Sequence, residues 1–143
     1  MRTALGAVTV LMTGALIGAG VATAEPTPPT PSSDQLQAQL QKVLDRGISD
    51  DERASELAGG LAAVPTANNI AGVIDQYSSM MSWRVENASR NGDQVDAQLA
   101  VTIPIFGTKT HQIYWVNQDG AWKLSNPSAC VIATQVAGTT CTV

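Results

Sequence analysis

The apolar residues of the chain change their spacing midway, from a helical period to a strand period. Between residues 34 and 80 they recur every three to four positions, as in an amphipathic helix. Between residues 82 and 105, and again between 111 and 124, they alternate with polar residues, as in a half-buried strand. The chain is therefore expected to form helices first and an antiparallel sheet second.

Residue types at the ends of the helical segments predict three helices. Ser32 opens the first with a capping box, and Gly47 is expected to end it in a left-handed conformation. Ser49 opens a second capping box before a short helix. Thr66 is expected to cap a third helix that reaches about Met80.

The first hairpin has two possible loops, and burial distinguishes them. A two-residue loop at 91–92 would turn polar side chains of the first strand toward the apolar face of the second. A three-residue loop at 90–92, with Gly92 left-handed, pairs Val85 with Ala97 and keeps the apolar residues together. We expect the three-residue loop.

The second hairpin needs no such choice. A two-residue turn at 119–120 pairs Trp115 with Leu124 and gathers the apolar residues on one face. Asn126 is then expected to cap a short last helix that reaches about Val136. The predicted fold class is α+β: helices on one face of a curved four-stranded antiparallel meander, a cone whose open end is a natural pocket.

The first 24 residues have the pattern of a signal peptide. Arg2 precedes an apolar run, and Ala22–Ala24 is the small-x-small sequence at which signal peptidase cuts, between Ala24 and Glu25. A retained membrane anchor is the alternative, but the run Leu5–Val21 is short and rich in glycine for a membrane span. The protein is expected to be secreted or associated with the cell envelope, without a stable membrane anchor.

The remaining chain is expected to be one domain, residues 34–143, behind a proline-rich flexible leader, residues 25–33. Cleavage removes Arg2, which leaves 12 acidic residues against seven basic ones. Such an acidic balance disfavours nucleic acid and anionic lipid as partners, because both recruit clustered Lys and Arg. Cys130 and Cys141 are the only cysteines, and in an exported protein they predict a disulfide.

Few residues are candidates for chemistry. His111, the only histidine, lies on the same strand face as Trp115, and Tyr77 has a polar tip that could face a pocket; these three are the candidate pocket residues. Asp75 and Asp96 are the carboxylates an enzyme could use inside a cone, although both are expected on the surface. No nucleophile motif, cofactor fingerprint or metal-ligand cluster occurs in the sequence, so no catalytic residue, cofactor or metal is predicted.

Two segments resemble a known family. The stretch Trp115–Ser125 is similar to the hairpin of the low-molecular-weight secreted antigens of mycobacteria and related actinobacteria, and Asp34–Leu40 to the start of their domain. The hairpin also resembles those of the cone-shaped superfamily of nuclear transport factor 2 and ketosteroid isomerase. The resemblance covers most of residues 32–130 and implies an exported protein of cystatin-like α+β fold, with no assigned enzymatic activity and no catalytic residue to transfer.

The leading functional hypothesis is a non-enzymatic exported protein that binds a small apolar ligand or a protein partner at the envelope or in a host. One rival is an isomerase- or cyclase-like enzyme with Asp75, Tyr77 or His111 in its cavity. Another is a structural or adhesive module of the cell envelope. The enzyme hypothesis requires that those three polar groups meet in one cavity.

Overall fold

A computed structural model describes residues 28–143. The expected signal peptide, its cut after Ala24 and the first leader residues lie outside this range. The elements in chain order are α1 (Ser33–Leu44), α2 (Asp50–Ala54), η2 (Gly60–Ala63), α3 (Val64–Gln76), β1 (Ser82–Asn91), β2 (Gln94–Ile103), β3 (Gly107–Gln118), β4 (Ala121–Leu124), α4 (Asn126–Val131) and η3 (Ile132–Val136). None of the helices in the described range is long and apolar enough to cross a membrane.

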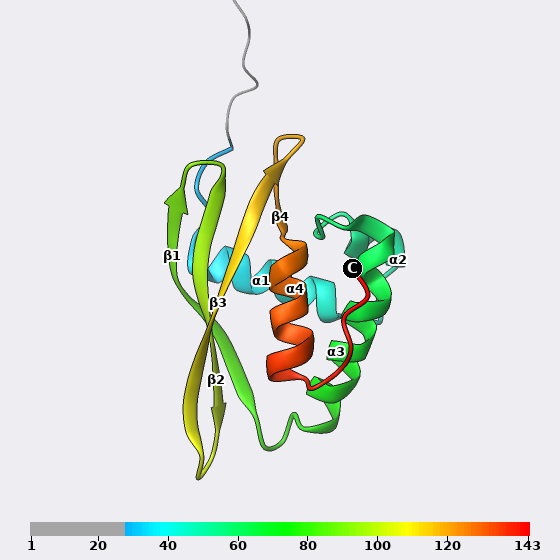
Figure 1. Cartoon of the computed structure of the whole chain (residues 1–143), viewed down its shortest axis with the longest axis vertical. Coiled ribbons are helices and arrows are strands. Elements are labelled where there is room, and N and C mark those ends of the chain that lie inside the picture. Colours follow the sequence, from blue (N-terminus) through cyan, green and yellow to red (C-terminus); the bar gives the residue numbers. More distant parts are fainter. Residues whose placement is uncertain (1–27) are drawn as a thin grey trace, which may run out of the picture.

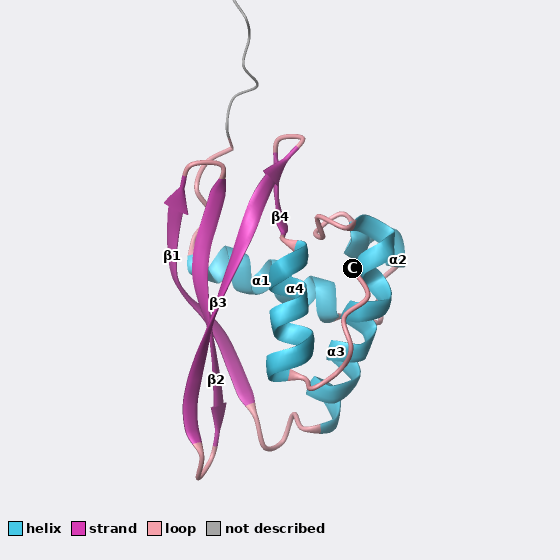
Figure 2. Cartoon of the chain, in the orientation of Figure 1, coloured by secondary structure: helices cyan, strands magenta, loops and turns pink. Residues whose placement is uncertain are grey.

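The molecule has two layers, a twisted sheet and a group of helices on one of its faces (Figures 1 and 2). The strands are antiparallel and in chain order, β1-β2-β3-β4. This confirms the predicted α+β class, with helices first, a four-stranded meander second and a short helix last. The turn between β2 and β3 forms the lower end of the molecule in Figure 1, and the described N-terminal residues lie at the upper end.

The hydrophobic core fills the space between the two layers. The buried face of α1 contributes Leu36, Leu40 and Val43, each of which is at most 2% exposed. The sheet contributes alternate residues of β2 and β3. Trp115 is the largest fully buried side chain. Each buried leucine or valine stabilises the fold by about 1.5–3 kcal/mol relative to exposure.

The first hairpin differs from the prediction in both its loop and its register. Asn91 pairs with Gln94 across a two-residue turn, and Val85 pairs with Leu99, not with Ala97. The predicted three-residue loop at 90–92 is therefore wrong. A β-bulge between Glu86 and Ser89 supplies the one-residue shift that the loop was expected to supply, so the apolar residues of both strands still share one face.

The second hairpin has the predicted register. Trp115 pairs with Leu124 and Asn117 with Trp122, across the turn at 119–120. The end of β4 also joins the helical half of the chain, because Leu124 exchanges backbone hydrogen bonds of 2.9 Å with Glu56 and Ala58. This contact ties the segment after α2 to the sheet.

Four predicted helix ends are shifted. The capping box at Ser32 is present, but α1 ends at Leu44, and Gly47 does not have the positive φ expected of a left-handed stop. α3 begins at Val64, before Thr66, and ends at Gln76. Ser125, rather than Asn126, caps α4.

Tertiary contacts explain the altered role of Thr66. Its fully buried hydroxyl accepts a 3.2 Å hydrogen bond from the Thr142 amide and lies 3.1 Å from the Thr142 hydroxyl. The predicted disulfide between Cys130 and Cys141 is present, with Cα atoms 5.2 Å apart. Together these contacts fasten the C-terminal segment, which crosses the helical layer in Figure 1.

The last residues of the expected leader also contact the domain. The Trp122 indole Nε1 donates a 3.0 Å hydrogen bond to the Pro29 carbonyl, and the Arg90 guanidinium lies 5.7 Å from the centre of the Trp122 ring. Ser33, the last residue assigned to the leader, is the first residue of α1, and its hydroxyl accepts a 3.0 Å hydrogen bond from the Ala88 amide. Residues 28–33 therefore lie against the hairpins that α1 also contacts.

Candidate functional site

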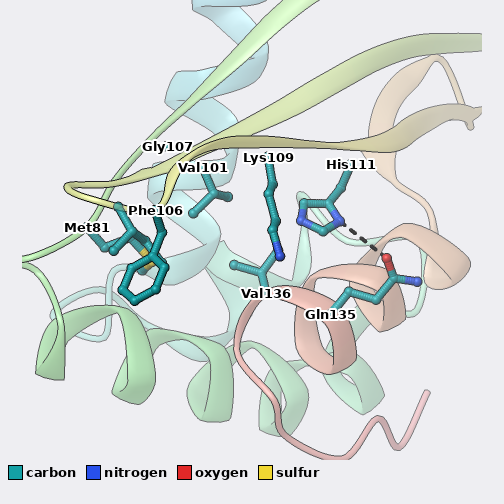
Figure 3. Close-up of a pocket in the computed structure, with 9 residues that line it drawn as sticks. Met81, Val101, Phe106, Gly107, Lys109, His111, Gln135 and Val136 are labelled. Atoms are coloured by element: carbon teal, nitrogen blue, oxygen red, sulfur yellow. Dashed lines mark hydrogen bonds between the residues drawn. The ribbon is translucent and has the colours of Figure 1, made fainter.

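A cleft opens at the lower end of the molecule, between the β2–β3 hairpin and the helical layer. It has two adjoining parts of about 360 and 390 Å³. Residues from the hairpin, from the segment before β1 and from η3 line both parts: Met81, Ile103, Phe106, Gln135 and Val136. Figure 3 shows the first part, with Phe106 and Met81 at one end and His111 and Gln135 at the other.

The apolar wall of the cleft is built by local structure on both sides. A tight turn, in which the Phe106 amide donates a 3.0 Å hydrogen bond to the Ile103 carbonyl, holds Phe106 beside the end of β2. The opposite wall comes from η3, where α4 continues as a π-helical segment and carries Gln135 and Val136. Short π-helical segments of this kind often occur at functional sites.

The polar groups of the cleft gather at one end of the first part. His111 Nδ1 lies 3.2 Å from the Gln135 side-chain oxygen. Figure 3 shows the other ring nitrogen on the side of Lys109. Lys109 takes part in no ion pair within residues 28–143. The cleft thus has an apolar end and an end with a free ammonium group.

The structure separates the three candidate pocket residues. His111 lines the first part of the cleft and Tyr77, which is 45% exposed, lines the second. Trp115 is 1% exposed in the core and lines neither part. The strand face predicted for His111 is therefore the face that carries the cleft, but its aromatic neighbour two residues further along lies deeper.

The candidate carboxylates lie outside the cleft. Asp75 accepts a 2.6 Å hydrogen bond from Arg46 in an exposed ion pair, and Asp96 accepts one of the same length from the Gln94 side chain. Neither lines the two parts of the cleft, so the three groups required by the enzyme hypothesis do not meet there. No group of three or more potential metal ligands occurs within the described residues.

Sequence reasoning missed three residues that define the cleft: Phe106, Lys109 and Gln135. A signal for Phe106 was present, because Ile105 and Phe106 form an apolar pair at the turn that Pro104 begins, where polar residues are usual. No comparable signal exists for Gln135, since its position beside His111 depends on how α4 and η3 pack on the sheet.

Comparison with known proteins gives one match, to the family described as low molecular weight antigen MTB12, C-terminal domain, over residues 29–141. The chain belongs to this family. Searches of curated proteins and of solved structures found no significant match.

The match to the MTB12 C-terminal domain confirms the resemblance to mycobacterial low-molecular-weight antigens seen in the sequence. The matched residues include both walls of the cleft and both cysteines. The cleft and the disulfide-bonded tail therefore lie within the family's domain, and the chain can be described as an antigen-like α+β protein.

Proposed function

We propose that this MTB12-family protein is exported and binds a small amphiphile, such as a fatty acid, in the cleft. The observation that carries the proposal is the division of the cleft into an apolar end and a cationic end. Export is supported by the signal-peptide pattern before Glu25 and by the family's description as an antigen. Protein recovered from culture medium should begin at Glu25, and retention of Met1 would contradict export by this route.

The apolar part of the ligand would lie on Met81, Phe106 and Val136. Pockets for small molecules typically have volumes of about 300–1,000 Å³ and apolar walls with a few polar groups. Each part of the cleft reaches the lower limit of this range, and their shared walls allow one elongated ligand to occupy both. An alkyl chain matches this shape better than a compact polar metabolite.

The head group would be an anion, held near Lys109 and His111. No aspartate or glutamate lines either part of the cleft, although the chain as a whole has a net charge of −4. A carboxylate or phosphate can accept charge-assisted hydrogen bonds from the Lys109 ammonium. The local charge therefore selects an anionic head over a cationic one.

Calorimetric titration with dodecanoate tests this proposal. We expect saturable binding, at least about tenfold weaker in Lys109→Glu, because a repulsive charge replaces an attractive one. Lys123→Glu, which makes the same charge change on β4 away from the cleft, is the matched control and should bind like the wild type.

Filling the cleft provides a second test. Val136→Trp should abolish dodecanoate binding by occupying the shared wall, while its far-ultraviolet circular dichroism stays that of the wild type. The proposal is wrong if dodecanoate does not bind the wild type. It is equally wrong if a folded Val136→Trp variant binds with unchanged affinity.

A further inference from the structure

The turn between β2 and β3, at the lower end of the molecule in Figure 1, contains two large apolar residues. Ile105 is 100% exposed and Phe106 is 80% exposed. Ile103, Met80 and Tyr77 line the second part of the cleft together with Phe106 and are also exposed, so the apolar surface continues from Phe106 to the mouth of the cleft. Ile105 and Phe106 together form the apolar tip.

Folding does not account for Ile105. Its φ of 82° lies in the left-handed region, which disfavours a β-branched residue by roughly 1–2 kcal/mol. Its side chain gains no burial in return, because it is fully exposed. Strained residues of this kind concentrate at functional sites, where a surface rather than the fold needs the side chain.

The part of the β2–β3 hairpin next to the apolar tip has no acidic residue, and Asp75 on α3, two residues before Tyr77, is paired with Arg46. Lys109 is the only Lys, Arg, Asp or Glu between residues 97 and 118, and residues 124–143 contain none. The acidic residues of the domain therefore lie on other segments. Lys109 is three residues along β3 from Phe106, which corresponds to about 10 Å.

We propose that the apolar tip inserts reversibly into the surface of a lipid bilayer. Apolar side chains of surface-bound proteins enter membranes to a depth of about 5–10 Å, which would bring Lys109 to the level of the lipid phosphates. A second copy of the chain is a poorer occupant, since a stable protein interface needs about 800 Å² from each partner, whereas the two most exposed apolar residues are confined to one hairpin turn at the lower end of the molecule. Docking at the tip brings the mouth of the cleft to the lipid surface.

The net charge of the protein does not oppose this docking on a neutral membrane. Repulsion of an acidic protein is expected from anionic lipid, whereas phosphatidylcholine carries no net charge. The inference goes beyond ligand binding and does not depend on it, because the apolar tip can insert with the cleft empty.

Flotation with phosphatidylcholine vesicles tests the inference. We expect the wild-type protein to float with the vesicles, and Ile105→Asp/Phe106→Asp to reduce the bound fraction at least about tenfold, because two apolar anchors are replaced by charges. Leu61→Asp is the matched control, since Leu61 is a 58% exposed apolar residue on η2, and it should float like the wild type.

Two further variants separate the possible outcomes. Ile105→Gly should bind less than the wild type while its far-ultraviolet circular dichroism stays that of the wild type, so the loss of binding in this variant cannot be attributed to unfolding. Val136→Trp should keep full vesicle binding even though dodecanoate binding is lost, which distinguishes docking from cleft occupancy. The inference is overturned if the wild type does not float, if the double variant floats equally well, or if Leu61→Asp loses binding to the same extent.

Discussion

Three residues other than glycine have a positive φ in the described part of the chain, and two of them are residue types that tolerate it. Asn87 donates a 2.8 Å hydrogen bond to the Gln98 side chain within the β-bulge, and Asp119 precedes Gly120 in the second hairpin turn. Asn and Asp adopt this conformation several times more often than other residues. Ile105 lacks both a suitable side chain and a contact, so it carries strain for which only a surface role accounts.

From the strained conformation of Ile105, we predict that Ile105→Gly stabilises the protein. Glycine relieves roughly 1–2 kcal/mol of left-handed strain and loses about 0.4–1 kcal/mol to the greater freedom of the unfolded chain. The expected net gain is about 0.5–1 kcal/mol in the free energy of unfolding, measured with urea. Asn87→Gly is the control and should give no gain, because it removes the hydrogen bond to Gln98. A destabilised Ile105→Gly variant would contradict this account.

Among the elements, α1 covers the exposed edge of the sheet. β1 is an edge strand, and two of its amides that do not pair with β2 are bonded to α1: Val85 donates to the Gln37 side-chain oxygen at 3.2 Å, and Ala88 to the Ser33 hydroxyl at 3.0 Å. Unpaired edge amides are templates for aggregation, so this cover also protects the sheet. The alternation of apolar and polar residues along β1 does not show which helix covers the strand.

We therefore predict that Gln37→Leu destabilises the protein by about 1–3 kcal/mol, because the Val85 amide would be left without a partner. Gln41→Leu makes the same chemical change on an exposed position of α1 and should have almost no effect. Urea unfolding of both variants measures the difference. Equal stability of the two variants would show that the Gln37 contact contributes nothing.

For the whole molecule, the two ends of the domain are each held by residues far away in the sequence. The N-terminal end is bound through Pro29 and Trp122, and the C-terminal end through Thr142 and Thr66. The disulfide closes only 11 residues of chain, but it joins α4 to the C-terminal segment across η3, which lines the cleft. Its removal should loosen the segment that holds the helical wall of the cleft.

Reduction of the disulfide should lower the free energy of unfolding by about 3 kcal/mol, the loop-closure entropy for a short loop. The measurement is urea unfolding with and without dithiothreitol. In Cys130→Ala/Cys141→Ala the reductant should have no effect, which separates the loss of the bond from other actions of the reagent. Unchanged stability of the reduced wild type would contradict the prediction.

Local patterns along the chain were sufficient for the order and type of the elements, for the second hairpin and for the cysteine pair. Each of these depends on residues that are close in sequence or on residue types with few alternatives: the spacing of apolar side chains, the turn at Asp119 and Gly120, and two cysteines behind a signal-peptide pattern. The capping box at Ser32 belongs to the same class, because its partners are three residues apart.

Tertiary packing decided the features that carry the proposed function. The β-bulge at Asn87 set the register of the first hairpin, and packing of η3 on the sheet brought Gln135 beside His111, 24 residues away. The sequence predicted Thr66 as a helix cap, but in the structure its hydroxyl accepts a hydrogen bond from the Thr142 amide. Its partner depends on where the fold places the C-terminal segment. Such contacts depend on the positions of whole elements, and the spacing of residues along the chain carries no information about them.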